Sequence, residues 1–306
     1  MEAAKYIGAD IGGTFIKLGI VSGAGDVRMR REIAVDKSGR ETVMETLCKG
    51  IDELLREAGL EAKAFGGIGV SAAGCIDTGN GRVSENGGNV PGWSFTSVTG
   101  PLLARYGIPA KIANDGNCVA LAEAWTGAAK GKSDVLCVVL GSGVGGGIIS
   151  GGRLIEGSRG FGGEIGHFPM HTEHGLSRDD WSSHYEAYAS TNGLVRIAND
   201  IGGPYRNGRQ VFNAAEAGKD DAIAALNKWL DEVAYGITGL VYIFNPSDVI
   251  IGGGVSAQDE LLIKPLRKKL LGLIMNDFVH GLEIKAAQLG NNAGMVGAVK
   301  YLIDHI

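Results

Sequence analysis

The chain has 306 residues, of which 44% are hydrophobic and 21% are charged, and its formal net charge is −5. This length allows two ordinary domains with a core in each. An acidic chain lacks the basic surface that nucleic-acid binding requires, so we expect no nucleic-acid partner. The 51 glycines are about a sixth of the chain, against a usual share of about 7%, and they gather at the ends of apolar segments.

Neither the cysteines nor the apolar segments indicate export or membrane insertion. Cys48, Cys75, Cys118 and Cys137 lack the spacing of a metal or redox motif and are expected to be free thiols. The first residues lack the basic region and apolar core of a signal peptide. The longest apolar helix segment, over residues 229–244, is shorter than the roughly 20 residues that span a bilayer. We therefore expect a cytoplasmic protein with no membrane partner.

The first half of the chain alternates strand and helix patterns. Two apolar segments, separated by glycines and followed by a turn at residues 22–26, predict a β-hairpin. Apolar residues at helical spacing then predict a helix that ends at Gly59, and a loop rich in Gly, Asn and Ser covers residues 74–97. The expected elements are strands over residues 6–9, 16–21, 68–70 and 111–113 and a helix over residues 43–55.

The second half repeats this order. A helix and a strand lead to another glycine-rich turn, and Gly151 and Gly152 close a second hairpin. Residues 157–183 show little periodicity, and long loops of this kind are usually functional or mobile. The expected elements are helices over residues 117–129, 185–199, 219–244 and 293–306 and strands over residues 135–140, 249–251 and 282–284.

Strands that alternate with helices predict an α/β fold. Because each half begins with a hairpin of the same form, we expect a duplicated domain with a cleft between the two copies. The expected first domain covers residues 1–117 and 293–306, and the second covers residues 118–292. The hinge is expected near Cys118, and the last helix is expected to return to the first domain.

Two glycine turns follow buried strands in the same way. One lies at residues 10–14 (Asp-Ile-Gly-Gly-Thr) and the other at residues 141–147 (Gly-Ser-Gly-Val-Gly-Gly-Gly). Turns without Cβ atoms let backbone N–H groups approach an anion closely. Two such turns suggest two lobes that grip one polyphosphate.

Asp10 lies where the first strand ends and the first turn begins. A carboxylate there suits a magnesium ion that keeps most of its water and bridges to phosphates. Gly12, Gly13 and Thr14 offer N–H and hydroxyl donors, and Lys17 adds a positive charge. On this motif alone, an ordinary tight hairpin with an aspartate in its turn is the alternative.

Asp115 follows a short strand and begins a helix, in the run Asn-Asp-Gly-Asn at residues 114–117. This position, near the expected cleft, suits a general base that takes the proton of a substrate hydroxyl. The alternative is a helix N-cap, which both Asp and Asn favour.

Taken together, these motifs resemble the ROK family of bacterial sugar kinases, within the actin-like ATPase superfamily. The resemblance covers nearly the whole chain in order. It includes both glycine turns, Asn114 with Asp115, and two further motifs at residues 163–167 (Gly-Glu-Ile-Gly-His) and 186–190 (Glu-Ala-Tyr-Ala-Ser). It implies a two-domain actin-like ATPase fold, similar to ribonuclease H, with an interdomain cleft.

The resemblance implies ATP-dependent, magnesium-assisted phosphorylation of a hexose hydroxyl, usually the 6-position. Asp115 matches the catalytic base of the family. The residues that match sugar-binding positions are Asn89, Asn114, Glu164, His167 and Glu186. The glycine turns and Gly252-Gly253-Gly254, which matches the part near the adenosine, give as expected nucleotide-binding residues Asp10, Gly12, Gly13, Thr14, Lys17, Gly141, Ser142, Gly143, Gly253 and Gly254.

One segment departs from the family. Many members carry a Cys-x-Cys-Gly-x-x-Gly-Cys zinc segment after the Gly-His pair, whereas this chain has no cysteine in residues 167–186. Ser177, Asp179 and His184 stand where the cysteines would be. In principle, zinc ligands could come from His167, His171, His174, His184 and Asp179. Their scattered spacing predicts no structural zinc, with hydrogen bonds and the packing of Trp181 and Tyr185 fixing the loop instead.

Several alternatives stay open at this point. Glucose is the expected sugar, and N-acetylmannosamine, fructose, allose or a β-glucoside are alternatives because the divergent loop helps to shape the sugar pocket. Trp93 and Trp181 could stack on a sugar face, although most tryptophans pack in a core. The family also contains sugar-responsive transcription regulators, which the acidic composition and the nine residues before Asp10 disfavour. An inactive sugar-binding protein is a third class. The resemblance suggests a homodimer, with a tetramer as the alternative.

Overall fold

The computed structural model of the chain describes residues 4–175 and 180–306. It contains two compact units, each with its own sheet and hydrophobic core. Unit 1 comprises Met1–Gly131, Leu154–Gly163 and Asn291–Ile306, and unit 2 comprises Lys132–Arg153 and Glu164–Gly290. The expected domain boundary after residue 117 falls inside helix α3 (Asp115–Trp125), all of which belongs to unit 1.

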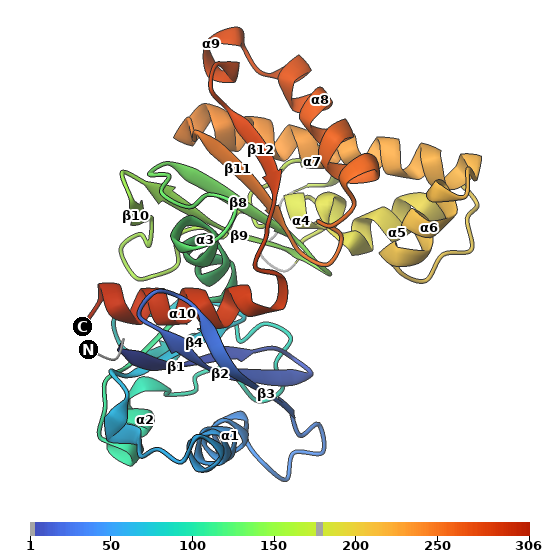
Figure 1. Cartoon of the computed structure of the whole chain (residues 1–306). Helices are drawn as coiled ribbons and strands as arrows, with labels where there is room; N and C mark the ends of the chain where they lie inside the picture. Colours follow the sequence, from blue (N-terminus) through green and yellow to red (C-terminus); the bar gives the residue numbers. More distant parts are fainter. Residues whose placement is uncertain (1–3, 176–179) are drawn as a thin grey trace. The chain divides into compact units, whose positions relative to one another are not determined.

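Unit 1 is built on a five-stranded mixed sheet of order β3-β2-β1-β4-β7, of which Figure 1 labels the first four strands. The first three strands form antiparallel pairs, whereas β1, β4 and β7 run parallel to one another. The strands are β1 (Lys5–Ile11), β2 (Phe15–Ser22), β3 (Val27–Ala34), β4 (Ile68–Ala72) and β7 (Ala110–Asn114), and a separate small pair is formed by β5 (Ile76–Asp77) and β6 (Arg82–Val83).

Helices cover both faces of this sheet (Figure 1). On one face, α10 packs so closely that a Cβ on Gly8 would lie 2.8 Å from the carbonyl oxygen of Met295. On the other, α1 packs against β2 and β3. Thr42 and Glu45 form a capping box at the start of α1, and Gly59 ends it in the left-handed conformation, as expected. The helices are α1 (Val43–Ala58), α2 (Thr99–Tyr106), α3 and α10 (Ala293–Asp304), with a short η1 (Ala62–Ala64) and η4 (Gly290–Asn292).

Unit 2 repeats the strand order of unit 1. Its sheet has the order β10-β9-β8-β11-β12, in which β8 pairs antiparallel with β9 and parallel with β11. The strands are β8 (Val135–Leu140), β9 (Val144–Ser150), β10 (Arg153–Leu154), β11 (Asp248–Gly252) and β12 (Glu283–Ala286). The expected duplication is therefore visible in the two sheets: β1 and β2 correspond to β8 and β9, and β4 corresponds to β11.

The core of unit 2 forms around the 25-residue helix α7, which buries residues along its whole length. Asn245 ends it in the left-handed conformation, close to the predicted end. The helices are α4 (Tyr185–Ala189), α5 (Thr191–Asp200), α6 (Gly208–Glu216), α7 (Asp220–Phe244), α8 (Lys264–Leu273) and α9 (Asn276–Val279), with a short η2 (Thr172–His174) and the π-helix η3 (Asp259–Ile263).

The prediction of one helix over residues 185–199 is wrong, because the helix is interrupted at Ser190. Ser190 has an extended backbone (φ −71°, ψ 165°), and its side chain accepts a hydrogen bond from the N–H of Gly193, which caps α5. The indole N–H of Trp229 donates to the carbonyls of Ala189 and Ser190, both at 3.0 Å. A side chain from α7 therefore takes the place of the helical bonds at the break.

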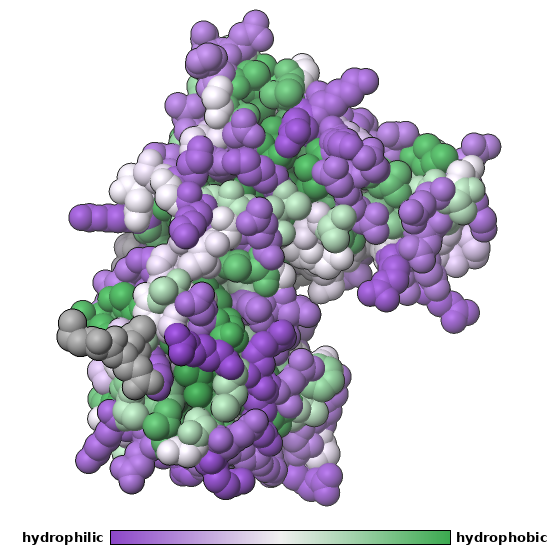
Figure 2. Space-filling model, in the orientation of Figure 1, coloured by the Kyte–Doolittle hydropathy of each residue, from purple (hydrophilic) through white to green (hydrophobic). Residues whose placement is uncertain are grey.

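Hydrophilic side chains cover much of the visible surface, with smaller hydrophobic areas between them (Figure 2). Among the helices that the structure describes, none has both the length and the apolar character that crossing a bilayer demands.

Candidate functional site

In unit 1, polar residues lie where three neighbouring parallel strands end. Asp10 on β1 is in register with Ser71 on β4, and Ala72 on β4 is in register with Asn114 on β7. Ligands of open α/β sheets bind at the carboxyl ends of the strands. The sheet thus brings the predicted residues Asp10 and Asn114, distant in sequence, to one edge.

The carboxylate of Asp10 is held from two sides. Oδ1 accepts a hydrogen bond from the Ser71 hydroxyl at 2.8 Å, and Oδ2 lies 3.5 Å from Nζ of Lys17. Gly294 at the start of α10 makes room for it, because a Cβ there would lie 2.4 Å from Cγ of Asp10. The side chain of Asp10 keeps 19% of its surface exposed and so remains accessible to a ligand. Sequence reasoning missed Ser71, since only the strand register places it here.

The first glycine turn closes tightly and touches a second predicted residue. The N–H of Gly12 donates to the carbonyl of Phe15 at 3.0 Å. A Cβ on Gly13 would lie 2.6 Å from the carbonyl oxygen of Asn89. The side chains of Thr14 and Asn89 are both exposed. Unit 1 therefore places the predicted phosphate turn against a predicted sugar-binding residue.

Asn114, rather than Asp115, caps helix α3. Its side-chain oxygen accepts from the N–H groups of Gly116 at 2.8 Å and Asn117 at 3.2 Å, and its amide donates to the carbonyl of Gly74 at 3.1 Å. Asp115 is the first residue of the helix and is exposed, and its Oδ1 also accepts from the N–H of Gly116 at 2.9 Å. A helix N-terminus stabilises a negative charge. The N-cap role considered for Asp115 is therefore filled by Asn114.

The two predicted site aspartates of unit 1 both affect one buried thiol. All four cysteines are free, and Cys118 is fully buried in α3. Burial raises the pKa of the Cys118 thiol well above its usual value, and the negative charges of Asp10 and Asp115 raise it further. Asp10 and Asp115 are therefore within electrostatic range of the same side chain, which stays protonated and neutral.

In unit 2, the second glycine turn touches Glu186. Oε2 of Glu186 accepts a hydrogen bond from the N–H of Val144 at 2.8 Å, and a Cβ on Gly143 would lie 2.3 Å from the same oxygen. Within the turn, the N–H of Gly141 donates to the carbonyl of Gly143 at 2.9 Å. A predicted sugar-binding residue again lies against a predicted phosphate turn.

Gly253 and Gly254 follow β11 next to this turn. Gly253 has φ +95°, and a Cβ there would lie 2.1 Å from the carbonyl oxygen of Leu140, the last residue of β8. Only glycine fits such a position without a backbone shift. The predicted nucleotide residues of unit 2 thus come from the ends of two neighbouring strands.

Glu164 and His167 are paired in unit 2, and the pair is ionic when the imidazole is protonated. Their Oε2 and Nε2 atoms are 3.3 Å apart, and each side chain is 30% exposed. The hydrogen bond that His167 donates to Glu164 raises the pKa of His167, against the opposing effect of burial. The ring of Trp181 meets that of His167 edge to face, with centroids 4.4 Å apart. Of the two tryptophans considered for sugar stacking, Trp181 is 41% exposed, whereas Trp93 is a core residue at 1%.

The expectation of no structural zinc stays a prediction. Ser177 and Asp179 lie outside the described residues, and among those described no group of three or more His, Cys, Asp or Glu residues is arranged to hold a metal. His171 has its two ring nitrogens 2.8 Å from carboxylate oxygens of Glu173 and Glu232. Those contacts satisfy this ring without a metal ion.

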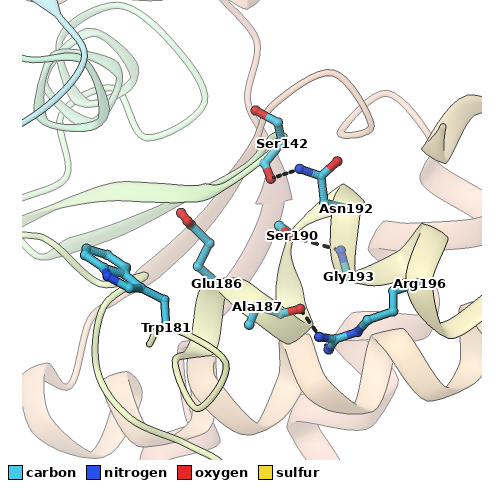
Figure 3. Close-up of a pocket in the computed structure, with 8 residues that line it drawn as sticks. All are labelled: Ser142, Trp181, Glu186, Ala187, Ser190, Asn192, Gly193 and Arg196. Carbon is cyan, nitrogen blue, oxygen red and sulfur yellow. Dashed lines mark hydrogen bonds between the residues drawn. The ribbon is translucent and has the colours of Figure 1, made fainter. Parts of the chain in front are cut away.

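A pocket of about 270 Å³ adjoins the second turn (Figure 3). It is lined by Ser142, Trp181, Glu186, Ala187, Ser190, Asn192, Gly193 and Arg196. Asn192 and Arg196 were not predicted as site residues. Ser190-Thr191-Asn192 before an apolar helix pattern is a capping signature that could have revealed the N-terminus of α5 here.

Known proteins resemble this chain over nearly its whole length. The sequence pattern of the ROK family matches residues 6–305. The chain is 32% identical to a glucokinase of Thermotoga maritima over 100% of this chain and 99% of that protein, and 30% identical to a β-glucoside kinase of Listeria innocua over 98% of each. The crystal structure of a ROK family glucokinase from Streptomyces griseus in complex with glucose and AMPPNP has a TM-score of 0.79 and 29% identity, with 97% of this chain and 99% of that chain covered. These similarities confirm the predicted actin-like ATPase fold, and the chain belongs to the ROK family.

Proposed function

We propose that this protein is an ATP-dependent hexose kinase that transfers the γ-phosphoryl group to a sugar hydroxyl, with the 6-hydroxyl of glucose as the first candidate. Its family membership and its similarity to glucokinases over the whole chain support this activity. The observation that carries the residue assignment is the exposed Asp115 at the start of α3, on the same sheet edge as Asp10.

Asp115 would act as the general base. It would accept the proton of the attacking sugar hydroxyl through a carboxylate oxygen, which requires the ionised form. The N-terminus of α3 favours that form. Because Asn114 supplies the cap, the Asp115 carboxylate does not have to hold the helix end.

Both glycine turns would bind the phosphates of ATP through backbone N–H groups, with Lys17 adding positive charge. The Asp10 carboxylate, with a hydroxyl beside it and partial exposure, fits a magnesium ion held through water. Magnesium would supply charge neutralisation on the transferring group. Gly253 and Gly254 would lie beside the adenosine.

Sugar hydroxyls would be recognised by carboxylate, imidazole and amide groups. In unit 2 these groups are Glu164, His167 and Glu186. In unit 1 they are Asn89 and Asn114, whose amide nitrogen carries two hydrogens, of which the carbonyl of Gly74 takes one.

A coupled ADP-release assay with a panel of sugars tests the proposal. Glucose, N-acetylmannosamine, fructose, allose and a β-glucoside are compared with a reaction without sugar, and Asp115→Asn is the control. We expect sugar-dependent ADP release that this variant loses. Sugar binding without ADP release would favour an inactive sugar-binding protein, and binding to DNA would favour a regulator.

Assembly and location complete the proposal. We infer a homodimer in the cytoplasm, where ATP is available and where the four free thiols stay reduced. Sedimentation of the purified protein measures the oligomeric state, and fractionation of the cells measures the location.

A further inference from the structure

The second glycine turn is attached to the N-terminus of helix α5 by three hydrogen bonds. The backbone N–H and the hydroxyl of Thr191 both donate to the carbonyl oxygen of Gly141, each at 2.8 Å. The side-chain amide of Asn192 donates to the carbonyl oxygen of Ser142 at 2.8 Å (Figure 3). Two consecutive carbonyl groups of the turn are thus directed at α5.

Because the peptide bond is planar, holding these carbonyl groups also sets the direction of the N–H groups that follow them. In a trans peptide the C=O of one residue and the N–H of the next lie in one plane and point in opposite directions. The carbonyls of Gly141 and Ser142 face α5, so the N–H groups of Ser142 and Gly143 face away from it. These are the N–H groups that an anion would meet.

The amides on either side of these two are used within the protein. The N–H of Gly141 donates to the carbonyl of Gly143, and the N–H of Val144 donates to Glu186. The turn is therefore held at both ends, and its middle amides have a fixed direction. Without such contacts, glycine-rich backbone loses more conformational entropy on binding than any other.

We propose that Thr191 and Asn192 are positioning residues that hold the second glycine turn in the conformation that binds the phosphates of the nucleotide. This inference rests on the proposed function and deepens it. Neither side chain has to touch the nucleotide, because each acts through a carbonyl of the turn.

Nucleotide binding measured by calorimetry tests the proposal, with AMPPNP and Mg²⁺ as the probe. Thr191→Val removes the hydroxyl at nearly constant volume and keeps the backbone N–H, whereas Thr191→Ser keeps both donors. We expect Thr191→Val and Asn192→Ala each to raise the Kd for AMPPNP about fivefold, the effect of one hydrogen bond, and Thr191→Ser to restore it. The KM for ATP should rise, while the KM for the sugar stays constant.

Thr46→Val is the matched control. The Thr46 hydroxyl also donates to a backbone carbonyl, that of Thr42 at 3.1 Å, but it lies in α1. The Thr46→Val variant should have a lower melting temperature and an unchanged Kd for AMPPNP. If Thr191→Val and Asn192→Ala behave like this control, or weaken sugar binding equally, the inference is overturned. Wild-type protein that does not bind AMPPNP would overturn the proposed function and this inference with it.

Discussion

Gly13 and Asn89 are packed so closely that the backbone of one excludes a side chain on the other. A Cβ at residue 13 would lie 2.6 Å from the carbonyl oxygen of Asn89. The first glycine turn and the loop that carries Asn89 are therefore fitted to each other, and the position of one constrains the other.

Gly13→Ala should disturb both the first glycine turn and the loop that carries Asn89. Because the obstacle is backbone, one of the two segments must shift, and overpacking of this kind costs about 1–3 kcal/mol of unfolding free energy. The KM for ATP and for the sugar should both rise. Urea denaturation and steady-state kinetics measure the two effects. Gly79→Ala, where the nearest atom to a Cβ is 3.8 Å away, is the control and should change neither.

Asp115→Asn should lower kcat by about a hundredfold or more, the range of general-base catalysis. The sugar Kd should change little, because the variant keeps the size of the side chain and Asn114 still caps α3. Steady-state turnover and calorimetric sugar binding separate the two quantities. A variant with near-wild-type turnover would remove Asp115 from its proposed role.

Glu164→Gln should lower the pKa of His167 towards the ordinary value of 6.5, because the hydrogen bond to Glu164 is the main cause of its rise. Titration of the His167 ring by NMR measures this. The raised pKa in the folded state means that the pair stabilises the protein below pH 6.5 and loses this effect as pH rises through the folded-state value. The stability difference between wild type and variant should therefore be larger at pH 5.5 than at pH 8.5. An equal stability difference at the two pH values would contradict the pairing of Glu164 with His167.

Asp248→Ala should lower the free energy of unfolding by about 2 kcal/mol at pH 7, because it removes the buried acceptor of hydrogen bonds from Ser247 and Lys285. Asp248 is fully buried at the start of β11, with Nζ of Lys285 at 2.7 Å and Nζ of Lys132 at 3.3 Å. Burial alone would raise the pKa of Asp248, but the bonds from Lys285, Ser247 and Lys132 outweigh it and lower the pKa.

The lowered pKa fixes the pH dependence of this effect. The stabilisation by Asp248 is present above its unfolded-state pKa, near 3.8, and is lost as pH falls through the lower folded-state value. Urea denaturation at pH 7 and pH 3 measures it. Asp304→Ala removes an ion pair on the surface and should cost less than about 1 kcal/mol. Equal losses for the two variants would show that burial does not matter at Asp248.

The sequence predicted the family, the α/β fold and most of the long elements, because these follow from local patterns. The hairpins show strand periodicity, and α1 and α7 have strong helical spacing with clear ends at Gly59 and Asn245. The break at Ser190 has a local capping signal in Ser190-Thr191-Asn192, but the indole N–H of Trp229 that replaces the helical bonds comes from 39 residues further along and has none.

The candidate site was predictable to the extent that single motifs carry it. Asp10 and Asp115 stand in recognisable runs, and their sheet edge follows from the parallel strands. The contacts that hold the site are long-range and have no local signal. Ser71 meets Asp10 only through register, and Thr191 meets Gly141 only through the folded unit. Their roles stay predictions until the variants are measured.

The two sheets share one strand order but differ in charge at the equivalent place. In unit 1, Asp10 stands one residue before the end of its strand, in register with Ser71. In unit 2, the same positions hold Val139 and Gly252. At this place unit 1 carries a carboxylate, whereas unit 2 carries an apolar side chain and a glycine. The two units therefore share an architecture but differ in electrostatics at this position, where only unit 1 offers a negative charge.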